Sequence, residues 1–552
     1  MSKIKIFSLG GLNENGKNMY VIEVDKDIFV FDAGLKYEDE KMLGVDYILP
    51  DYSYLKENRK RIKGFFLTHG HDTHIGAMAD ILADPVMNSV NVYAAKFTLD
   101  MLKKDLAEDK VKAKNLHEIK PYVKINFGKN SIFPLSVTHS IPDSLAYVLY
   151  TKDGAIVYTG DFVFDSTMSG NYKTDIGKLA YVGKQGVLCL LSESVYAENT
   201  GFTTPKNRVY QFIKDVLGKT QDRVIVTVQS SHIYRLQEIL NVCDKYHKKL
   251  IIMGKSLQEL INKCIDDKYL IYDKSTIGDL SNLDEKNTVV LISDDREKPY
   301  MNLERVVKGF DKYIKLKETD MIFVCEPPTD SNEKRFALLM DELAMAGVNS
   351  TSLTRRTHLQ HHASREDLML MINLMNPKYY FPVRGEYRNQ VKNAELAELQ
   401  GIPKENIILK QNGDVAIFEN GVLSNETYHI QTDEILIDGK SQGDIGDLVL
   451  KDREMLGSNG IVIVSCTIDK TTKEILSGPE ILTRGFVYVK DNAELLHETQ
   501  EICSEIIENN IDKNNKSVDY NNIKNEVRSV LGKHYYKELD SKPMIITVIQ
   551  EV

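Results

Sequence analysis

Three histidines stand within six residues of one another, directly after an apolar segment. In FFLTHGHDTHIGA they are His69, His71 and His74. Imidazole is a common ligand of first-row metals, and three imidazoles at the end of a strand are typical of a metal site. A histidine-rich surface loop is the alternative interpretation, but it suits one histidine better than three that follow a buried strand. The pattern therefore predicts a metal site.

Three more candidate ligands also follow apolar segments. Asp32 ends IFVFDAG, His139 ends PLSVTHS and Asp161 ends AIVYTGDF. An aspartate at the end of a strand is most often a cap or turn residue, so each of these positions alone says little. With the histidine loop, these positions make four groups of possible ligands at strand ends in one domain, a number that chance does not readily explain. We therefore expect these side chains to meet.

The elements that must position these residues change character along the chain. Residues 1–200 contain β-branched and aromatic strand candidates that end at Gly or Asp, which predicts packed sheets. Residues 205–370 alternate apolar strands with helical stretches, which predicts a parallel α/β domain. VAIFENGVL indicates a hairpin that turns at Asn420 and Gly421. A Gly- and Asp-rich connection at 425–450 precedes a small α/β unit.

Composition bounds the class of protein. A chain of 552 residues with 42% hydrophobic residues can form about three or four domains. Its net charge of −10 argues mildly against nucleic acid as a partner, although a basic channel can be local. Six scattered cysteines without a C-x-x-C pair favour a reducing compartment. The absence of an apolar span or signal peptide predicts a cytoplasmic protein that does not enter membranes.

Several long motifs together resemble one family. They are SLGGLNENGKNMYVIEV, FDAGL, LGVDYILPDYSYL, LTHGHDTHIGA, THSIPDS, YTGDFVFD, LLSESVYAENTGFT, PKYYFPVRGEYR, GDIGDLVLKDREML and GPEILTRGFVYV. The chain resembles bacterial ribonuclease J, in the β-CASP branch of the metallo-β-lactamase superfamily, and is most similar to its second, degenerate paralogue type.

The resemblance implies an α/β fold, a metallo-β-lactamase αββα sandwich with two further domains. The sandwich would comprise residues 1–202 and 373–424. An inserted β-CASP α/β domain would span 203–372. A linker at 425–449 would lead to a C-terminal α/β oligomerisation domain at 450–552.

The resemblance also implies a ligand set for two metals. His69, His71 and His139 would hold the first metal, and Asp161 would bridge to the second. Of the second set His74 remains, while Thr73 and Arg384 stand where the family has Asp and His. A neutral Thr is a poor ligand, and Arg cannot ligate because it stays protonated. We therefore expect one well-bound ion, zinc or manganese. In the alternative, the Arg384 side chain turns to solvent and a second ion still binds.

The RNA-binding part of the family pattern is eroded. Glu193 keeps a carboxylate where the family has Asp, and we expect catalytic roles for Asp161, His362 and Glu193. THLQHHASRED keeps the two histidines of the family's phosphate-binding loop, which predicts RNA contacts from His358, His362 and Ser364. His361 replaces a glycine and restricts backbone approach. Asp294 and Asp295 would oppose phosphate.

The resemblance therefore implies a metal-dependent ribonuclease with 5′–3′ exonuclease activity and some endonuclease activity, acting in RNA maturation and decay. Its substrate would be RNA with a 5′ monophosphate, and its turnover would be low. The alternative is a near-inactive structural partner of an active ribonuclease J paralogue. A generic small-molecule hydrolase has no use for the extra domains. The C-terminal unit, through the helix NAELLHETQEICSEIIENN, would form a homodimer or a hetero-oligomer with a paralogue.

Overall fold

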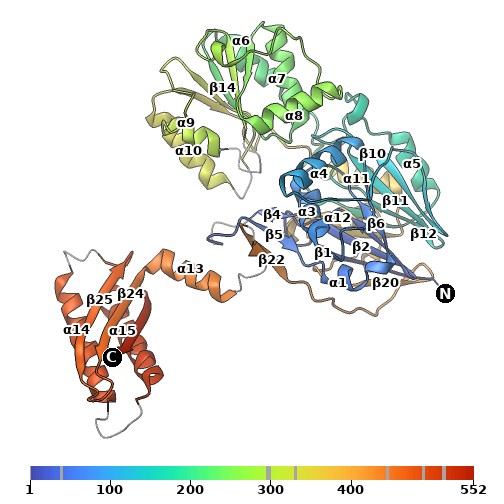
Figure 1. Ribbon diagram of the computed structural model, residues 1–552. Coiled ribbons are helices and arrows are strands. Elements are labelled where there is room, and N and C mark those ends of the chain that lie inside the picture. The colour runs from blue at the N-terminus through green and yellow to red at the C-terminus, as the bar shows by residue number, and fades with distance from the viewer. Residues whose placement is uncertain are drawn as a thin grey trace. The chain divides into compact units, whose positions relative to one another are not determined.

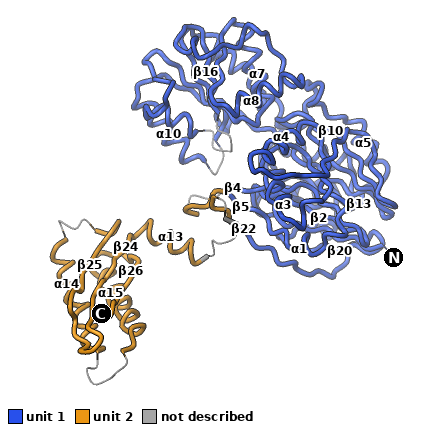
Figure 2. Tube along the Cα trace, in the orientation of Figure 1, with its two compact units in different colours: residues 1–37, 47–435 blue, residues 38–46, 436–552 orange. Residues whose placement is uncertain are grey.

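The structure is a computed structural model that describes residues 2–37, 42–293, 300–328, 332–439, 441–442, 447–487, 492–511 and 518–552. The chain forms two compact units (Figure 2), one of residues 1–37 and 47–435 and the other of residues 38–46 and 436–552. Within the described residues, no helix combines the length and the apolar character that a membrane span requires.

Two sheets form the first part of unit 1 (Figure 1). The eight-stranded sheet contains, in spatial order, β21 (Val422–Leu423), β20 (Ala416–Glu419), β1 (Lys3–Gly10), β2 (Met19–Val24), β3 (Asp27–Phe31), β6 (Ile62–Phe66), β7 (Val92–Ala94) and β8 (Leu116–Glu118). The six-stranded sheet contains β19 (Tyr379–Pro382), β13 (Val187–Ser192), β12 (Gly154–Tyr158), β11 (Leu145–Thr151), β10 (Asn130–Ser136) and β9 (Ile125–Phe127). A short antiparallel pair joins β4 (Lys36–Tyr37) to β5 (Tyr47–Pro50).

Alternating side chains along the strands explain why the two sheets pack face to face. In β12, Ile156 and Tyr158 enter the core between the sheets, whereas Ala155 and Val157 enter a second core under helices. That second core includes side chains of α5 (Ile176–Lys184), α11 (Arg365–Met375) and α12 (Tyr387–Leu399). The other helices of this region are the short α1 (Ser53–Glu57), α2 (Asp72–Ile75) and α3 (Met78–Ala83) and the longer α4 (Lys96–Glu108). The layers are those of the predicted αββα sandwich.

Two late strands complete the two sheets. β19 pairs in parallel with β13, and β20 pairs antiparallel with β1. β20 and β21 form the hairpin predicted around Asn420 and Gly421. The chain therefore leaves the sandwich after β13 and returns to it.

Between departure and return lies a parallel α/β domain (Figure 1). Its sheet has the order β15 (Lys249–Ile252), β16 (Thr288–Ile292), β14 (Val224–Thr227), β17 (Met321–Val324) and β18 (Asn349–Ser352). One face packs against α6 (Tyr210–Lys219), α7 (Ile233–Lys245) and α8 (Lys255–Asp266). The other face packs against α9 (Met301–Val307) and α10 (Glu333–Met345). The strand–helix alternation in the sequence predicted this domain correctly.

Unit 2 ends in a three-stranded sheet with the order β25 (Ile475–Arg484), β24 (Ile461–Ile468) and β26 (Met544–Glu551). Its core includes side chains of α14 (Ala493–Asn510) and α15 (Tyr520–Leu539). The predicted linker differs from what is observed, because β22 (Glu434–Asp438), β23 (Ser441–Gln442) and the start of α13 (Asp447–Asn459) lie in it. Of the strand predicted at GFVYV, residues 485–487 follow the end of β25 at Arg484, and residues 488–489 lie outside the described residues.

Candidate metal centre

The histidine loop is built by the end of β6 and the start of α2. β6 ends at Phe66, His69 follows, and His71 is the residue that precedes the first turn of α2. The loop packs tightly against Gly34, because a Cβ at Gly34 would lie 1.7 Å from the Thr73 carbonyl oxygen. Glycine at position 34 therefore lets the segment after β3 pass beside the loop and fixes its path.

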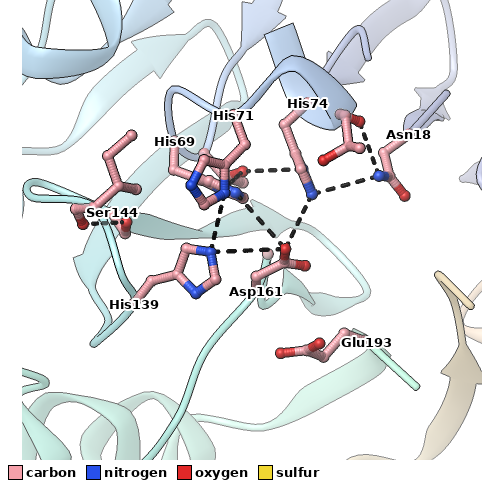
Figure 3. Close-up of polar contacts among 12 residues, drawn as sticks. Asn18, His69, His71, His74, His139, Ser144, Asp161 and Glu193 are labelled. Carbon is pink, nitrogen blue, oxygen red and sulfur yellow. Dashed lines mark hydrogen bonds and ion pairs between the residues drawn. The ribbon is translucent and has the colours of Figure 1, made fainter. Parts of the chain in front are cut away.

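The four predicted strand-end clusters do meet. Figure 3 shows the histidines of the loop together with His139 and Asp161, and Asp32 contacts the last histidine of that loop. His69, His71 and His139 offer ring nitrogens that all lie within 4.8 Å of one another. His139 Nε2 is 3.2 Å from His71 Nδ1, and Asp161 Oδ2 is 3.6 Å from His69 Nε2. Asp161 is 1% exposed and His69 is fully buried. These residues form one enclosed cluster of donor atoms.

The charge states of this cluster suit a cation. Burial, and next the neighbouring histidines, hold the pKa of His69 and of His139 well below the ordinary value. Burial also lowers the pKa of His71 to about 3. Neutral imidazoles keep a lone pair for a metal. His69 Nε2 and both carboxylate oxygens of Asp161 are buried without a hydrogen-bond partner, so the donors present fit a divalent metal.

His74 is held by two of the carboxylates that stand at strand ends. Its Nδ1 lies 2.7 Å from Asp32 Oδ2, and its Nε2 lies 3.3 Å from Asp161 Oδ2. Asp32 also accepts hydrogen bonds from the Thr68 backbone and from the Tyr158 hydroxyl. Burial opposes a charge on His74, but Asp161 and Asp32 outweigh it and raise its pKa. Asp32, a candidate ligand by its place in the sequence, instead orients His74.

The rest of the second ligand set is absent. Asp72, the residue before Thr73, does not replace the missing carboxylate, since the Tyr37 hydroxyl donates to its side chain. The Thr73 carbonyl accepts from the Asn18 side-chain amide at 2.8 Å, and the same amide nitrogen lies 3.4 Å from His74 Nε2. Arg384 is only 7% exposed, so it does not turn to solvent. Its Nε lies 2.8 Å from Asp161 Oδ1.

The proton-transfer candidates lie beside Asp161. His362 Nδ1 is 2.9 Å from Glu193 Oε2 and 3.7 Å from Asp161 Oδ2. Burial raises the pKa of Glu193 even though His362 beside it acts in the opposite direction. Glu193 also accepts from the backbone N–H of Phe162, which ties it to the segment that carries Asp161. The structure brings together all three residues for which we expected catalytic roles.

The predicted RNA loop is only partly available. His358 is near the surface, with its ring 5.1 Å from that of Phe212, and burial lowers its pKa. Ser364 is fully buried, its hydroxyl lies 2.7 Å from that of Thr203, and it caps α11. Ser364 therefore has a structural role as the cap of α11 and is too buried to contact RNA directly. Asp294 and Asp295 lie outside the described residues.

His361 turns inward and also supports the metal cluster. Its side chain is buried, with its ring 5.1 Å from His232 and 5.7 Å from Tyr234. Its carbonyl oxygen lies 2.7 Å from His139 Nδ1, which leaves His139 Nε2 directed at the site. The residue that replaces the glycine of the phosphate-binding loop thus packs into the inserted domain.

Four family profiles match the chain in order. They are the metallo-beta-lactamase superfamily over residues 12–172, the ribonuclease J beta-CASP domain over 221–343, the Zn-dependent metallo-hydrolase RNA specificity domain over 353–409, and the ribonuclease J C-terminal domain over 448–552.

Full-length relatives agree. The chain is 38% identical over 555 residues to ribonuclease J2 of Bacillus subtilis, covering all of this chain and 99% of that protein. It is 36% identical over 560 residues to ribonuclease J 2 of Staphylococcus aureus, covering all of this chain and 98% of that protein. The chain belongs to the ribonuclease J family.

As a ribonuclease J family member, the chain is a metallo-β-lactamase and β-CASP nuclease, a metal-dependent hydrolase that acts on RNA. A crystal structure of a protein of unknown function from Enterococcus faecalis also shares the fold. Its TM-score is 0.53 at 13% identity, and the match covers 76% of this chain and all of that one. The mild argument from net charge against RNA is thus wrong.

Proposed function

We propose that this chain hydrolyses RNA from a 5′-monophosphate end in the 5′–3′ direction, with some endonucleolytic cleavage and with low turnover, using one zinc or manganese ion. It would act in the cytoplasm, in RNA maturation and decay. One observation carries the proposal. Asp161 and three neutral histidines form a donor set in which only His71 is partly exposed, while Thr73 and Arg384 leave the neighbouring position without two of its four ligands.

His69, His71, His139 and Asp161 would hold the ion. When bound, it would supply a Lewis acid for a phosphate oxygen and acidify a water. His362 stands on the side of Asp161 that faces Glu193, and its ring can hold or deliver a proton at Nδ1 or Nε2. Glu193 fixes the orientation of that ring through its contact with Nδ1. The burial of His69, His139, Asp161 and Glu193 keeps bulk water away from these groups.

The test compares metal content with RNA degradation on the purified chain. We expect one ion per chain and slow shortening of 5′-monophosphorylated RNA from its 5′ end, with less from 5′-triphosphorylated RNA. Treatment with a chelator should stop the reaction, and zinc or manganese should restore it. Two tightly bound ions, or equal rates on both RNA ends, would contradict the proposal.

The second candidate is a structural partner of an active paralogue, and one observation in unit 2 favours it. The apolar face of α14 is not free, because Cys503, Ile506 and Ile507 are buried in the unit's own core. A different surface is exposed instead. Leu482 and Ile546 flank Ile463 across the sheet and are 45% and 40% exposed, and Val548 on the same face is 46% exposed. Such a bare apolar row suits association with another chain.

Charge on that row tests this candidate. Leu482→Lys with Ile546→Lys should turn the assembled protein into a monomer by light scattering, both alone and mixed with a ribonuclease J paralogue. Leu399→Lys is the matched control, since Leu399 is 67% exposed on α12 in unit 1. An oligomer that survives the double change would remove this sheet face as the contact.

A further inference from the structure

The backbone holds Arg384 in an uncommon conformation. Its φ is +53°, in the left-handed region that costs a non-glycine residue about 1 kcal/mol or more. The N–H of Arg384 donates to the Gly11 carbonyl at 3.0 Å, and its carbonyl accepts from the Ser194 N–H at 3.2 Å. Backbone hydrogen bonds among three segments that are far apart in sequence therefore fix the Cα position of Arg384. This close control of the backbone favours a specific role for the guanidinium.

Asp161 divides its two oxygens between two surroundings. Oδ2 faces the histidines, 3.6 Å from His69 and 3.9 Å from His139. Oδ1 faces the guanidinium, with Arg384 Nε at 2.8 Å. A carboxylate that bridges two cations has this arrangement, with one oxygen toward each cation. Here the cation that faces Oδ1 is the guanidinium of Arg384, a side chain of the protein itself.

A permanent cation lies at this place, because a guanidinium stays protonated in proteins. Arg384 is 7% exposed, and its Nε lies 2.8 Å from the carboxylate of Asp161, which is 1% exposed. The donors left for a second metal are His74 and the shared Asp161, whose Oδ2 lies 3.3 Å from His74 Nε2. Beside them a divalent metal would meet the fixed positive charge of Arg384, a neutral Thr73 and the amide of Asn18. Two donors beside a fixed cation do not fit a second metal.

The guanidinium still has unused donors. The side chain is 9% exposed, and its Nε and Nη1 have no hydrogen-bond partner, since the contact of Nε with Asp161 lacks the alignment of a hydrogen bond. Buried charged donors without acceptors are costly, so the site is built to receive an anionic oxygen. An arginine matches phosphate geometry well. We propose that Arg384 takes the place of the second metal ion and binds a non-bridging oxygen of the RNA phosphate, an inference that rests on the proposed function.

Two readouts test this inference separately. Arg384→Gln removes the charge and Arg384→Lys keeps it, while Lys392→Gln, on the exposed surface of α12, is the control for net charge. Each folded variant is titrated at low salt with 5′-monophosphorylated RNA that carries non-hydrolysable linkages, and its metal content is counted by native mass spectrometry. Low salt matters because screening hides single charges.

We expect Arg384→Gln to bind this RNA about ten- to a hundredfold more weakly, the range for a lost charged hydrogen bond. Arg384→Lys should lose less, about threefold to tenfold, because it keeps the charge without the planar fork. Lys392→Gln should match the wild type, and all four proteins should hold one ion.

Unchanged or tighter RNA binding in Arg384→Gln would overturn the inference, as would a second ion that enters that variant without any other change. If Arg384→Gln does not fold, Arg384→Lys decides alone, and wild-type affinity in it overturns the inference. A wild-type chain that binds RNA and does not cleave it would sink the proposed hydrolysis while leaving the role of Arg384 intact.

Discussion

The two sides of Asp161 solve the same electrostatic problem differently. On one side, His69 and His139 are buried, His71 is half-buried, and all three are neutral and without enough internal partners, so the carboxylate needs an added cation. On the other side, Arg384 neutralises the carboxylate permanently. Both sides keep the backbone frame, because the loop of Thr73 and His74 still packs against Gly34 and Asn18. A ligand position can thus change its chemistry without a change of fold.

The largest effect should come from the histidine side. His71→Asn removes a neutral imidazole from the donor set, and we expect loss of the bound ion with a fall in cleavage rate on the order of a thousandfold. The rate of RNA cleavage and the metal content are measured on the same sample. His117→Asn, at an exposed histidine bonded to Asn91, is the control and should change neither. If His71→Asn keeps both the bound ion and the cleavage rate, the histidine side of Asp161 does not depend on an added cation.

The arginine side of Asp161 should become a metal site after two substitutions. Thr73→Asp with Arg384→His restores the family's ligands, and we expect a second ion and a rate on the order of ten- to a hundredfold higher. Neither single change should raise the rate, because Thr73→Asp leaves the guanidinium in place and Arg384→His removes one cation without admitting another. The effects are therefore strongly non-additive. A double variant that binds the second ion and cleaves no faster would favour the structural-partner candidate.

A smaller loss should follow from Glu193→Gln, which lies between the two sides. The amide keeps the shape but cannot stabilise a charge on His362, so kcat should fall about tenfold. KM and the metal content should stay as in the wild type. A changed metal content would place Glu193 among the ligands instead of beside His362.

The smallest effect concerns Asp72, whose carboxylate accepts a hydrogen bond from the Tyr37 hydroxyl. Burial, and then the Asp72 charge, raise the pKa of Asp105 on α4 to about 7. An unfolded Asp titrates near 4. Between about pH 4 and 7 the folded chain holds a proton that the unfolded chain releases, so stability falls as the pH rises through this window.

Asp105→Asn abolishes that loss. It should raise the free energy of unfolding on the order of 2 kcal/mol at pH 8 and leave it nearly unchanged at pH 4, as measured by denaturant unfolding at both values. An equal gain at both pH values would show that Asp72 and Asp105 do not share an unfavourable charge.

Much of this site could be read from residue types and spacing. Strand-end positions predicted that His69, His71, His139 and Asp161 would meet, because the ends of neighbouring strands share one edge of a sheet. The direction of Arg384 could not be predicted, since it depends on a carboxylate more than two hundred residues earlier in the chain. The roles of Asn18 and Asp32 are likewise set by hydrogen bonds between distant strands. The sequence motif that contains Asn18 was recognised, but the spacing of its residues did not predict the contact of Asn18 with His74.

The failures in unit 2 have a common physical cause. α15 was not predicted, because its buried residues form one narrow stripe on an otherwise polar helix: Ile523, Val527, Leu531 and Tyr535. β25 was not predicted, because one of its faces is uncovered, so its sequence carries polar residues and lacks a clear apolar run. Small units with exposed faces give weak periodic signals.

The late return of β19 and β20 has a consequence for synthesis. β1 has no partner on one edge until β20 emerges, since Lys3 lies opposite Glu419. At roughly 5–20 residues per second, a ribosome needs about 20 to 80 seconds to make the intervening stretch. The parallel domain between them can fold during that interval, whereas the sandwich must wait. Arg384 joins Asp161 only in the last third of translation, so the nascent chain carries the histidines long before it carries a finished site.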